Sequence, residues 1–207
     1  MKMKPTIKDF YMEIRKSPGR FLSILFIVAL GVAFFSGIQA SSPDMRYSGD
    51  AYYEAAKLMD LKIQGTLGLT QRDVKAVSDI DGVELAEGGY STDVMSGEDD
   101  ARKVLHLESI SSNFNLLTAD EGRIPKKSGE IFLDKPFAKN RGYKIGDTIS
   151  VSEDGDSELL KKTTYTVVGI GSSPLYISFN RGNTTLGSGE VSGFGYILPE
   201  DFDQEAF

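Results

Sequence analysis

Residues 21–38 form a run of 18 amino acids without a charged side chain. At 1.5 Å rise per residue, a helix over this run reaches about 27 Å, and continuation to residue 40 gives about 30 Å, the thickness of the bilayer hydrocarbon. The apolar cores of signal peptides usually hold about 7–15 residues, so the length favours a retained transmembrane helix over residues 21–40. A cleaved signal peptide is the alternative, because the tripeptide "IQA" before Ser41 resembles a cleavage site.

The residues before this run carry a helical pattern of their own. Its apolar positions follow the spacing i, i+3, i+4 and i+7: Ile7, Phe10, Tyr11 and Ile14. Such an amphipathic helix is expected to lie flat at a membrane surface. Pro18 and Gly19 then break it and let the chain turn into the bilayer. A signal peptide needs neither feature, so residues 1–20 favour the retained helix.

The charges are distributed unevenly along the chain. Residues 1–20 hold six basic and two acidic residues, a net charge of +4, whereas the whole chain carries −7, which leaves −11 for the remainder. A basic leader before the apolar run predicts a cytoplasmic N-terminus, with residues 41–207 on the outer side of the cell membrane. An acidic domain has little electrostatic reason to bind nucleic acid, so we exclude that class of partner.

Residues 41–110 read as a helical stalk followed by a small α+β lobe. The run from residue 51 to 59 favours helix, and we assign residues 41–59 to the stalk. Leu61 and Ile63 alternate with polar neighbours as in a short strand. Thr70 and Asp73 have the spacing of a capping box that opens a helix. With a further strand over residues 83–95, residues 60–110 predict a βαβ-type lobe.

Strands dominate residues 111–207, which predict a β-rich lobe. The motif "GEIFLDKPFAKNRGYKIGDTISV" gives a strand, a short helix at residues 136–140 and a second strand, and "TTYTVVGIG" is the most β-rich run of the chain. In the glycine-rich end we expect strands at residues 176–179 and 193–198, with exposed aromatic side chains. The connection between these strands is a candidate recognition loop. Its named residues are Arg181, Asn183 and Glu190.

No catalytic, metal or cofactor motif is found. The chain has one histidine, His106, and no cysteine, which removes thiol chemistry and cysteine-based metal sites. The acidic stretch at residues 153–158 lacks the order of a calcium-binding EF-hand loop, and residues 97–100 are also best interpreted as a solvated loop. No phosphate-binding P-loop occurs. We therefore expect a protein that is not an enzyme and binds no cofactor.

The ordered set "GEIFLDKPFAKNRGYKIGDTISV…YTVVGIG" resembles the extracytoplasmic core domain of MacB/FtsX-like ABC transporter permeases. In that family a strand and a short helix lead to a Gly-x-x-x-Gly-Asp turn, which here is Gly142, Gly146 and Asp147. The glycines permit turns with positive φ, and the Asp can bond backbone N–H groups two residues on, so these residues are assigned to folding. The resemblance also implies further membrane helices after the domain, so we expect the chain to be part of a longer permease.

The resemblance implies the function of a permease subunit in a mechanotransmitting ABC transporter. A separate cytoplasmic ABC ATPase would then contact the surface helix with its residues Ile7, Phe10, Tyr11 and Ile14. Membrane lipid and a second permease unit are the other implied partners. Two alternatives are a single-span surface protein that binds a ligand or cell-wall component, and a secreted binding domain released by signal cleavage.

Overall fold

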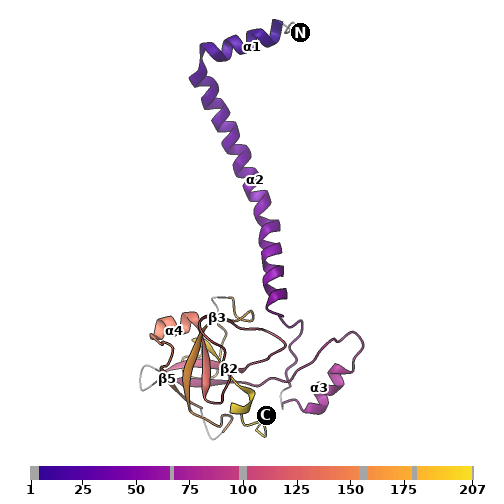
Figure 1. The fold of residues 1–207 in the computed structure, drawn as a ribbon, viewed down its shortest axis with the longest axis vertical. Coiled ribbons are helices and arrows are strands. Elements are labelled where there is room, and N and C mark those ends of the chain that lie inside the picture. The colour runs from indigo at the N-terminus through magenta and orange to yellow at the C-terminus, as the bar shows by residue number, and fades with distance from the viewer. Residues whose placement is uncertain (1–4, 66–67, 98–101, 154–157, 179–180, 207) are drawn as a thin grey trace. The chain divides into compact units, whose positions relative to one another are not determined.

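The computed structural model describes residues 5–65, 68–97, 102–153, 158–178 and 181–206, with the side chains of residues 5–8 left aside. The chain divides into two units, residues 1–52 and 53–207, and each is described by itself. The first unit is helical, and the second is built around a β-sheet (Figure 1).

The first unit consists of α1, Pro5–Lys16, and most of α2, Pro18–Ala55. Only Ser17 separates the two helices, and Pro18 takes the first helical position of α2, where its missing N–H has no intrahelical partner to lose. α2 continues across the boundary expected at residue 40, with Pro43 inside it. The predicted membrane helix and most of the predicted stalk are therefore one helix of 38 residues.

In the second unit, the segment between the end of α2 and the first strand contains α3, Gln71–Ser78. The predicted capping box is present, because Thr70 N–H donates to Asp73 Oδ2 at 2.7 Å and Asp73 N–H donates to Thr70 Oγ1 at 3.4 Å. The strand predicted at Leu61–Ile63 is wrong, and the strand predicted over residues 83–95 is confirmed only in its second part, because β1 begins at Ser91. Alternating apolar residues form a strand only when a neighbouring strand completes the hydrogen-bond ladder, and Leu61 is instead 83% exposed.

The remaining chain forms one sheet with two short helical segments. The strands are β1 Ser91–Ser96, β2 Lys103–Ser109, β3 Thr118–Gly122, β4 Glu130–Asp134, β5 Thr148–Ser152, β6 Thr164–Ser172 and β7 Gly193–Ile197. α4, Lys135–Arg141, follows β4 where the short helix was predicted, and a 3₁₀ turn, η2, covers Pro199–Asp201. The predicted strand over residues 193–198 is confirmed as β7.

The strand pairings close most of the sheet into a ring. The order is β3-β6-β4-β7-β2-β1-β5, and β5 pairs with β6 as well as with β1. Six strands therefore form a closed ring, with β3 attached beside β5 on the same edge of β6. The α+β class is confirmed, and the ranges 60–110 and 111–207 that we treated as two lobes contribute strands to this single sheet.

One face of the ring forms the main hydrophobic core. Each strand of the ring contributes side chains to this core, and two glycines of β7 make room for it. A side chain at Gly193 would overlap Phe137 of α4, and a Cβ at Gly195 would lie 2.8 Å from Leu107 Cδ2. The residues of this core from the strands are Val94, Leu105, Leu107, Ile131, Leu133, Ile149, Val151, Tyr165, Val167, Ile170 and Ile197.

A second, smaller cluster lies on the opposite face, over β2, β4 and β7. We call it the outer-face cluster, and its buried members are Val104, Phe132, Val191, Phe194 and Tyr196. Phe194 and Tyr196 are 2% and 4% exposed, so the expectation that these aromatics are exposed is wrong. Residues 176–178 form no strand; instead Tyr176 stacks on Phe194, with 3.6 Å between ring centroids. Residue 179 lies outside the described chain.

An ion pair beside β4 makes the stability of this domain depend on pH. Arg123 donates to both carboxylate oxygens of Glu130, at 2.5 and 2.7 Å, and the amides of Lys126 and Lys127 donate to the same group. These bonds, above all the one from Arg123, lower the pKa of Glu130 from 4.5 to about 2. The stability that this carboxylate contributes is complete above pH 4.5 and is lost as the pH falls toward 2.

We therefore expect the Tm of the chain to fall as the pH is lowered through this range, and to fall less in a Glu130→Gln variant. Differential scanning calorimetry between pH 6 and pH 2, roughly the window of carboxylate titration, measures the effect. Glu205→Gln, an exposed site near the end of the chain, is the matched control and should follow the wild type. Parallel curves for wild type and Glu130→Gln contradict this assignment.

Candidate functional site: membrane segment and outer-face cluster

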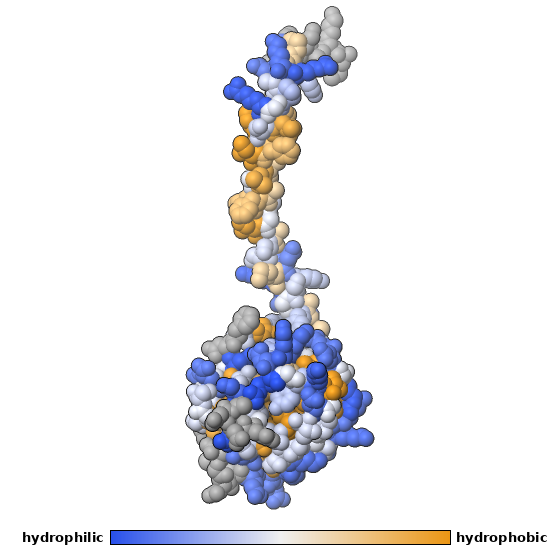
Figure 2. All heavy atoms as spheres, turned by 90° about the vertical axis from the view of Figure 1, so that its left-hand side faces the viewer, coloured by the Kyte–Doolittle hydropathy of each residue, from blue (hydrophilic) through white to orange (hydrophobic). Residues whose placement is uncertain are grey.

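The first candidate site is the helical segment, whose apolar side chains lie on its surface. No residue of α2 is buried within the chain, and Ile27, Leu30 and Phe34 are 72%, 73% and 72% exposed. Figure 2 shows these apolar side chains gathered along one stretch of the helix, with hydrophilic side chains on either side. Among the described helices, α2 alone is long and apolar enough to cross a bilayer, judged by length and composition. Lipid is the solvent that suits this surface.

α1 carries the predicted surface-helix residues. Phe10 and Tyr11 are 60% and 63% exposed and approach edge to face, with 6.3 Å between ring centroids. Ile14 is half-buried, and the side chain of Ile7 lies outside the described part of the chain. Arg15 and Lys16 occupy the last turn, where cations interact favourably with the helix dipole. The described side chains thus offer an apolar contact surface beside basic residues.

The residues of the family turn hold the backbone between α4 and β5. Gly142 and Gly146 have φ values of +77° and +93°, in the region that glycine enters without strain. Asp147 accepts a hydrogen bond at 2.8 Å from the amide of Lys144, three residues earlier, so the expected bond to an amide two residues on is wrong. Gly146 N–H donates to Val167 O at 2.8 Å, which ties the turn to β6.

The candidate recognition loop is fastened to the outer-face cluster at its start. The Arg181 guanidinium lies 3.2 Å from Asp134 at the end of β4 and 5.2 Å from the centre of the Phe194 ring. The two charged side chains are only 16% and 10% exposed. Burial raises the pKa of Asp134, and the positive charge of Arg181 acts in the opposite direction. Arg181 is thus held inside the domain, and is not a free surface cation.

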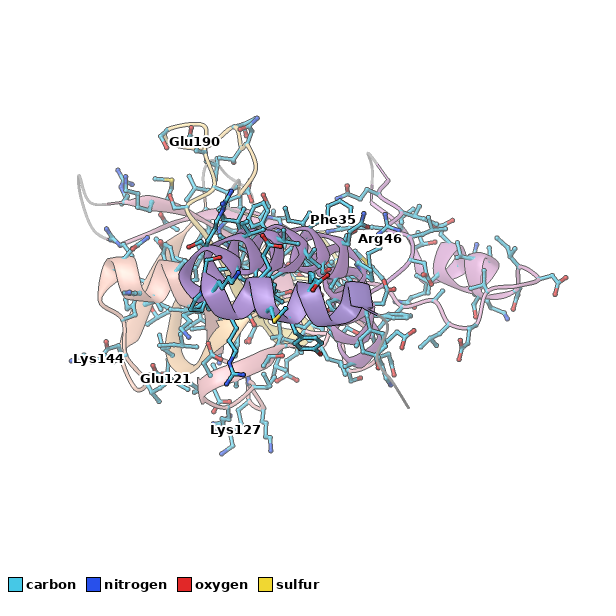
Figure 3. The ribbon with its side chains drawn as sticks, turned by 90° about the horizontal axis from the view of Figure 1, so that it is seen from above. Phe35, Arg46, Glu121, Lys127, Lys144 and Glu190 are labelled. Atoms are coloured by element: carbon cyan, nitrogen blue, oxygen red, sulfur yellow. The ribbon has the colours of Figure 1, made fainter. Side chains whose placement is uncertain are left out.

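The rest of this loop folds back on itself. Asn183 and Glu190 face each other in an antiparallel bridge, and Val191 N–H donates to Gly182 O at 3.1 Å. Ser192 N–H donates to Val104 O, which fixes the loop to β2. Asn183 and Glu190 lie away from the core, and Glu190 stands at the outer end of the loop (Figure 3). The structure therefore brings Asn183 and Glu190 together and keeps Arg181 apart from them.

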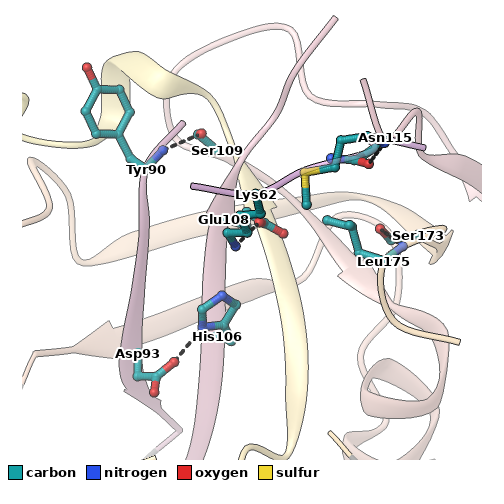
Figure 4. Close-up of polar contacts among 10 residues, drawn as sticks. Lys62, Tyr90, Asp93, His106, Glu108, Ser109, Asn115, Ser173 and Leu175 are labelled. Atoms are coloured by element: carbon teal, nitrogen blue, oxygen red, sulfur yellow. Dashed lines mark hydrogen bonds and ion pairs between the residues drawn. The ribbon is translucent and has the colours of Figure 1, made fainter. Parts of the chain in front are cut away.

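A histidine–aspartate pair that the sequence left unassigned lies beside the same cluster. His106 Nδ1 of β2 is 2.6 Å from Asp93 Oδ1 of β1, because these residues are direct partners in the strand register (Figure 4). The His106 ring also meets Tyr176 and Phe194 edge to face, at 6.1 and 6.0 Å. This pair becomes visible only through the register of the β1–β2 hairpin. The sequence of residues 98–101, which connect the two strands, contains no turn motif from which that register could be predicted.

The described residues contain no group of three metal-ligating side chains. Within the acidic stretch at residues 153–158, Glu153 accepts hydrogen bonds from the amides of Leu159 and Leu160, at 2.8 and 3.4 Å, while residues 154–157 lie outside the described chain. The stretch at residues 97–100 lies outside it as well, except for Gly97.

The start of the second unit is attached to the sheet by polar contacts. Lys62 Nζ lies 3.1 Å from Glu108 Oε1 of β2, and Met59 N–H donates to Asn115 Oδ1 at 3.1 Å (Figure 4). A groove of about 170 Å³ lies between these segments, bordered by Met59, Lys62, Glu108 and Tyr196 among others. This junction lies directly after the end of α2, and no sequence motif marks it.

The chain is similar to one protein family and to one solved structure. The family model of the MacB-like periplasmic core domain matches residues 21–203. A likeness of 13% identity and TM-score 0.42 relates the chain to the crystal structure of the extracellular domain of the noncanonic ABC-type transporter YknZ from Gram-positive bacteria, covering 65% of this chain and 64% of that one. The chain thus spans less than two thirds of that structure, and none of the curated proteins matches it. The match over nearly the whole chain confirms the resemblance: the chain belongs to the MacB-like periplasmic core domain family, a component of ABC transporter permeases.

Proposed function

We propose that this chain is the permease subunit of a mechanotransmitting ABC transporter, which passes motion from a cytoplasmic ATPase to its extracytoplasmic domain. The observation that carries the proposal is the continuity of α2. One helix runs from Pro18 through the apolar stretch to Ala55, and its last residues, 53–55, already belong to the second unit. A helix of 38 residues is about 57 Å long, almost twice the hydrocarbon thickness, so it extends well beyond a membrane.

α1 supplies the contact with the partner in this proposal. Its exposed Phe10 and Tyr11, with Ile14, form the surface that the ATPase engages while the basic residues face the lipid headgroups. ATP binding and hydrolysis by the partner would then shift α1, and α2 would carry that shift outward as a rigid rod. The lipid and a second permease unit complete the assembly around α2.

The orientation in the membrane is tested by single cysteines, because the chain has none of its own. We expect Cys at position 48 (Ser48→Cys) to react with a membrane-impermeant thiol reagent in intact cells. Cys at position 9 (Asp9→Cys) should react only after the membrane is permeabilised. Labelling of position 9 but not of position 48 in intact cells contradicts a cytoplasmic N-terminus.

A further inference from the structure

We infer that Lys57 and Asn115 are positioning residues, whose paired left-handed backbones lock the end of α2 to the β-domain so that movement of the helix reaches the sheet. This inference rests on the proposed function and names the residues through which the coupling passes. Among the described residues, these two are the non-glycine positions with positive φ, at +49° and +50°. They also bond to each other, because Asn115 N–H donates to Lys57 O at 2.9 Å.

Lys57 ends α2 in the geometry of a Schellman motif. Leu58 N–H donates to Tyr53 O at 3.0 Å, and Lys57 N–H donates to Glu54 O at 3.1 Å. The residue that takes the left-handed conformation in this motif is usually glycine. For other L-residues the conformation is sterically unfavourable. A lysine here restricts the backbone more than glycine would, so the direction in which the chain leaves the helix is more tightly defined.

Asn115 holds the other side of the junction. Its side-chain Oδ1 accepts the hydrogen bond of Met59 N–H at 3.1 Å, while its own amide bonds to Lys57 O. Leu116 N–H adds a third bond, to Ala56 O at 2.8 Å, and Ala56 is buried. Three hydrogen bonds therefore join the segment of residues 56–59, directly after α2, to two residues of the loop. We call these contacts the junction clamp.

The loop that carries Asn115 is held by its own hydrogen bonds and leads directly into the sheet. Ser111 Oγ accepts hydrogen bonds from the amides of Asn113 and Phe114, at 3.0 and 2.9 Å, and donates to Glu87 at 2.9 Å. β3 begins at Thr118, three residues after Asn115, and pairs with β6. A displacement at residues 56–59 is thus carried over a short, hydrogen-bonded path into two strands. Non-glycine residues keep a strained conformation only where their surroundings determine it, and strain of this kind concentrates at functional elements.

The test replaces both residues with glycine, which keeps the left-handed conformation and the backbone bonds but loosens the clamp. In the Lys57→Gly/Asn115→Gly chain, we expect the Leu116 amide to exchange with deuterium about tenfold faster than in the wild type. The Tm of the domain should change by no more than about 4 °C. The effect of the chain on ATP hydrolysis by its co-purified ATPase should fall at least about fivefold. Asp81→Gly, in an exposed turn after α3, is the control and should leave all three quantities unchanged.

Two outcomes overturn the inference alone. Unchanged exchange at Leu116 shows that these residues do not hold the junction. Faster exchange with an undiminished effect on the ATPase shows that the clamp is only structural. A wild-type chain that has no effect on any co-purified ATPase overturns the proposed function together with this inference, so the two failures are distinguishable.

Discussion

Replacement of Arg181 with alanine is expected to lower the free energy of unfolding of the domain by about 3 kcal/mol at pH 7, because it leaves the Asp134 carboxylate buried without its counter-charge. Asp134 is 7% exposed, and Arg181 is its ion-pair partner at 3.2 Å. The substitution also removes the guanidinium from the face of Phe194. Urea unfolding followed by circular dichroism measures the loss.

The pH dependence of this loss has a definite sign. Burial raises the pKa of Asp134 in the folded domain, and removal of Arg181 takes away the charge that opposes this rise. A carboxyl group whose pKa is raised on folding favours the folded state when it is protonated, so the deficit of Arg181→Ala should shrink as the pH is lowered from 7 toward 4, about the pKa of a free Asp.

Two further variants separate the buried pair from the loop around it. Arg181→Met/Asp134→Leu replaces both charges with apolar groups and should recover most of the stability lost in the single variant. Glu190→Ala, in the outer part of the same loop, should change stability by no more than about 0.5 kcal/mol. A fully stable Arg181→Ala chain contradicts the structural role of the pair and returns Arg181 to the exposed recognition surface that the sequence suggested.

The second large effect is expected for Gly171→Ala in β6. A Cβ at this position would overlap the carbonyl oxygen of Thr118 in β3 and would lie 2.8 Å from Phe132 Cζ. The carbonyl oxygen of Thr118 belongs to the backbone of β3. It cannot move away without breaking the β3–β6 pairing at Thr118 and Ser172. We expect a loss of about 3 kcal/mol in the free energy of unfolding, at the upper end for an overpacked core.

The matched control for this variant is the same substitution at Gly49. This glycine lies in α2, and no atom lies within 4 Å of the position that a Cβ would occupy there. Alanine is also the better helix former at such a site, by about 0.5–1 kcal/mol. Thermal unfolding of the domain should therefore be unaffected by Gly49→Ala. If Gly171→Ala unfolds at the same temperature as the wild type, β3 does not pack against β6 as described.

Patterns of neighbouring residues in the sequence predicted individual helices and strands, but they did not predict which distant strands pair with each other. The capping box at Thr70 opened α3, the proline-containing "KPFAKNR" formed α4, and "TTYTVVGIG" became β6. Ring closure depends on short pairings, such as Met95 with Ser152, between strands more than 50 residues apart. Nothing in either segment alone specifies its partner. We therefore expected two lobes where one sheet forms.

The same contrast between local patterns and long-range contacts applies to the candidate sites. The apolar length of α2 and the stripe of α1 are properties of consecutive residues, so they could be read directly. The partner of Arg181 comes from β4, 47 residues away, and the bond between Lys57 and Asn115 joins the end of a helix to a distant loop. Alternation at Leu61 and Ile63 resembled a strand, but among the described residues no strand pairs with that segment. An alternating sequence pattern alone does not show whether a neighbouring strand is available to pair with the segment.

The most direct test of the proposed coupling is whether α1 connects this permease component to an ATPase. The wild-type chain, purified from its own cells in lipid nanodiscs, should retain an ABC ATPase and change its rate of ATP hydrolysis. Phe10→Ser/Tyr11→Ser/Ile14→Ser removes the apolar surface of α1 and should reduce both retention and rate change by at least about tenfold, with the Tm of the β-domain unchanged. Equal retention and equal modulation by the wild type and this variant would contradict coupling through α1.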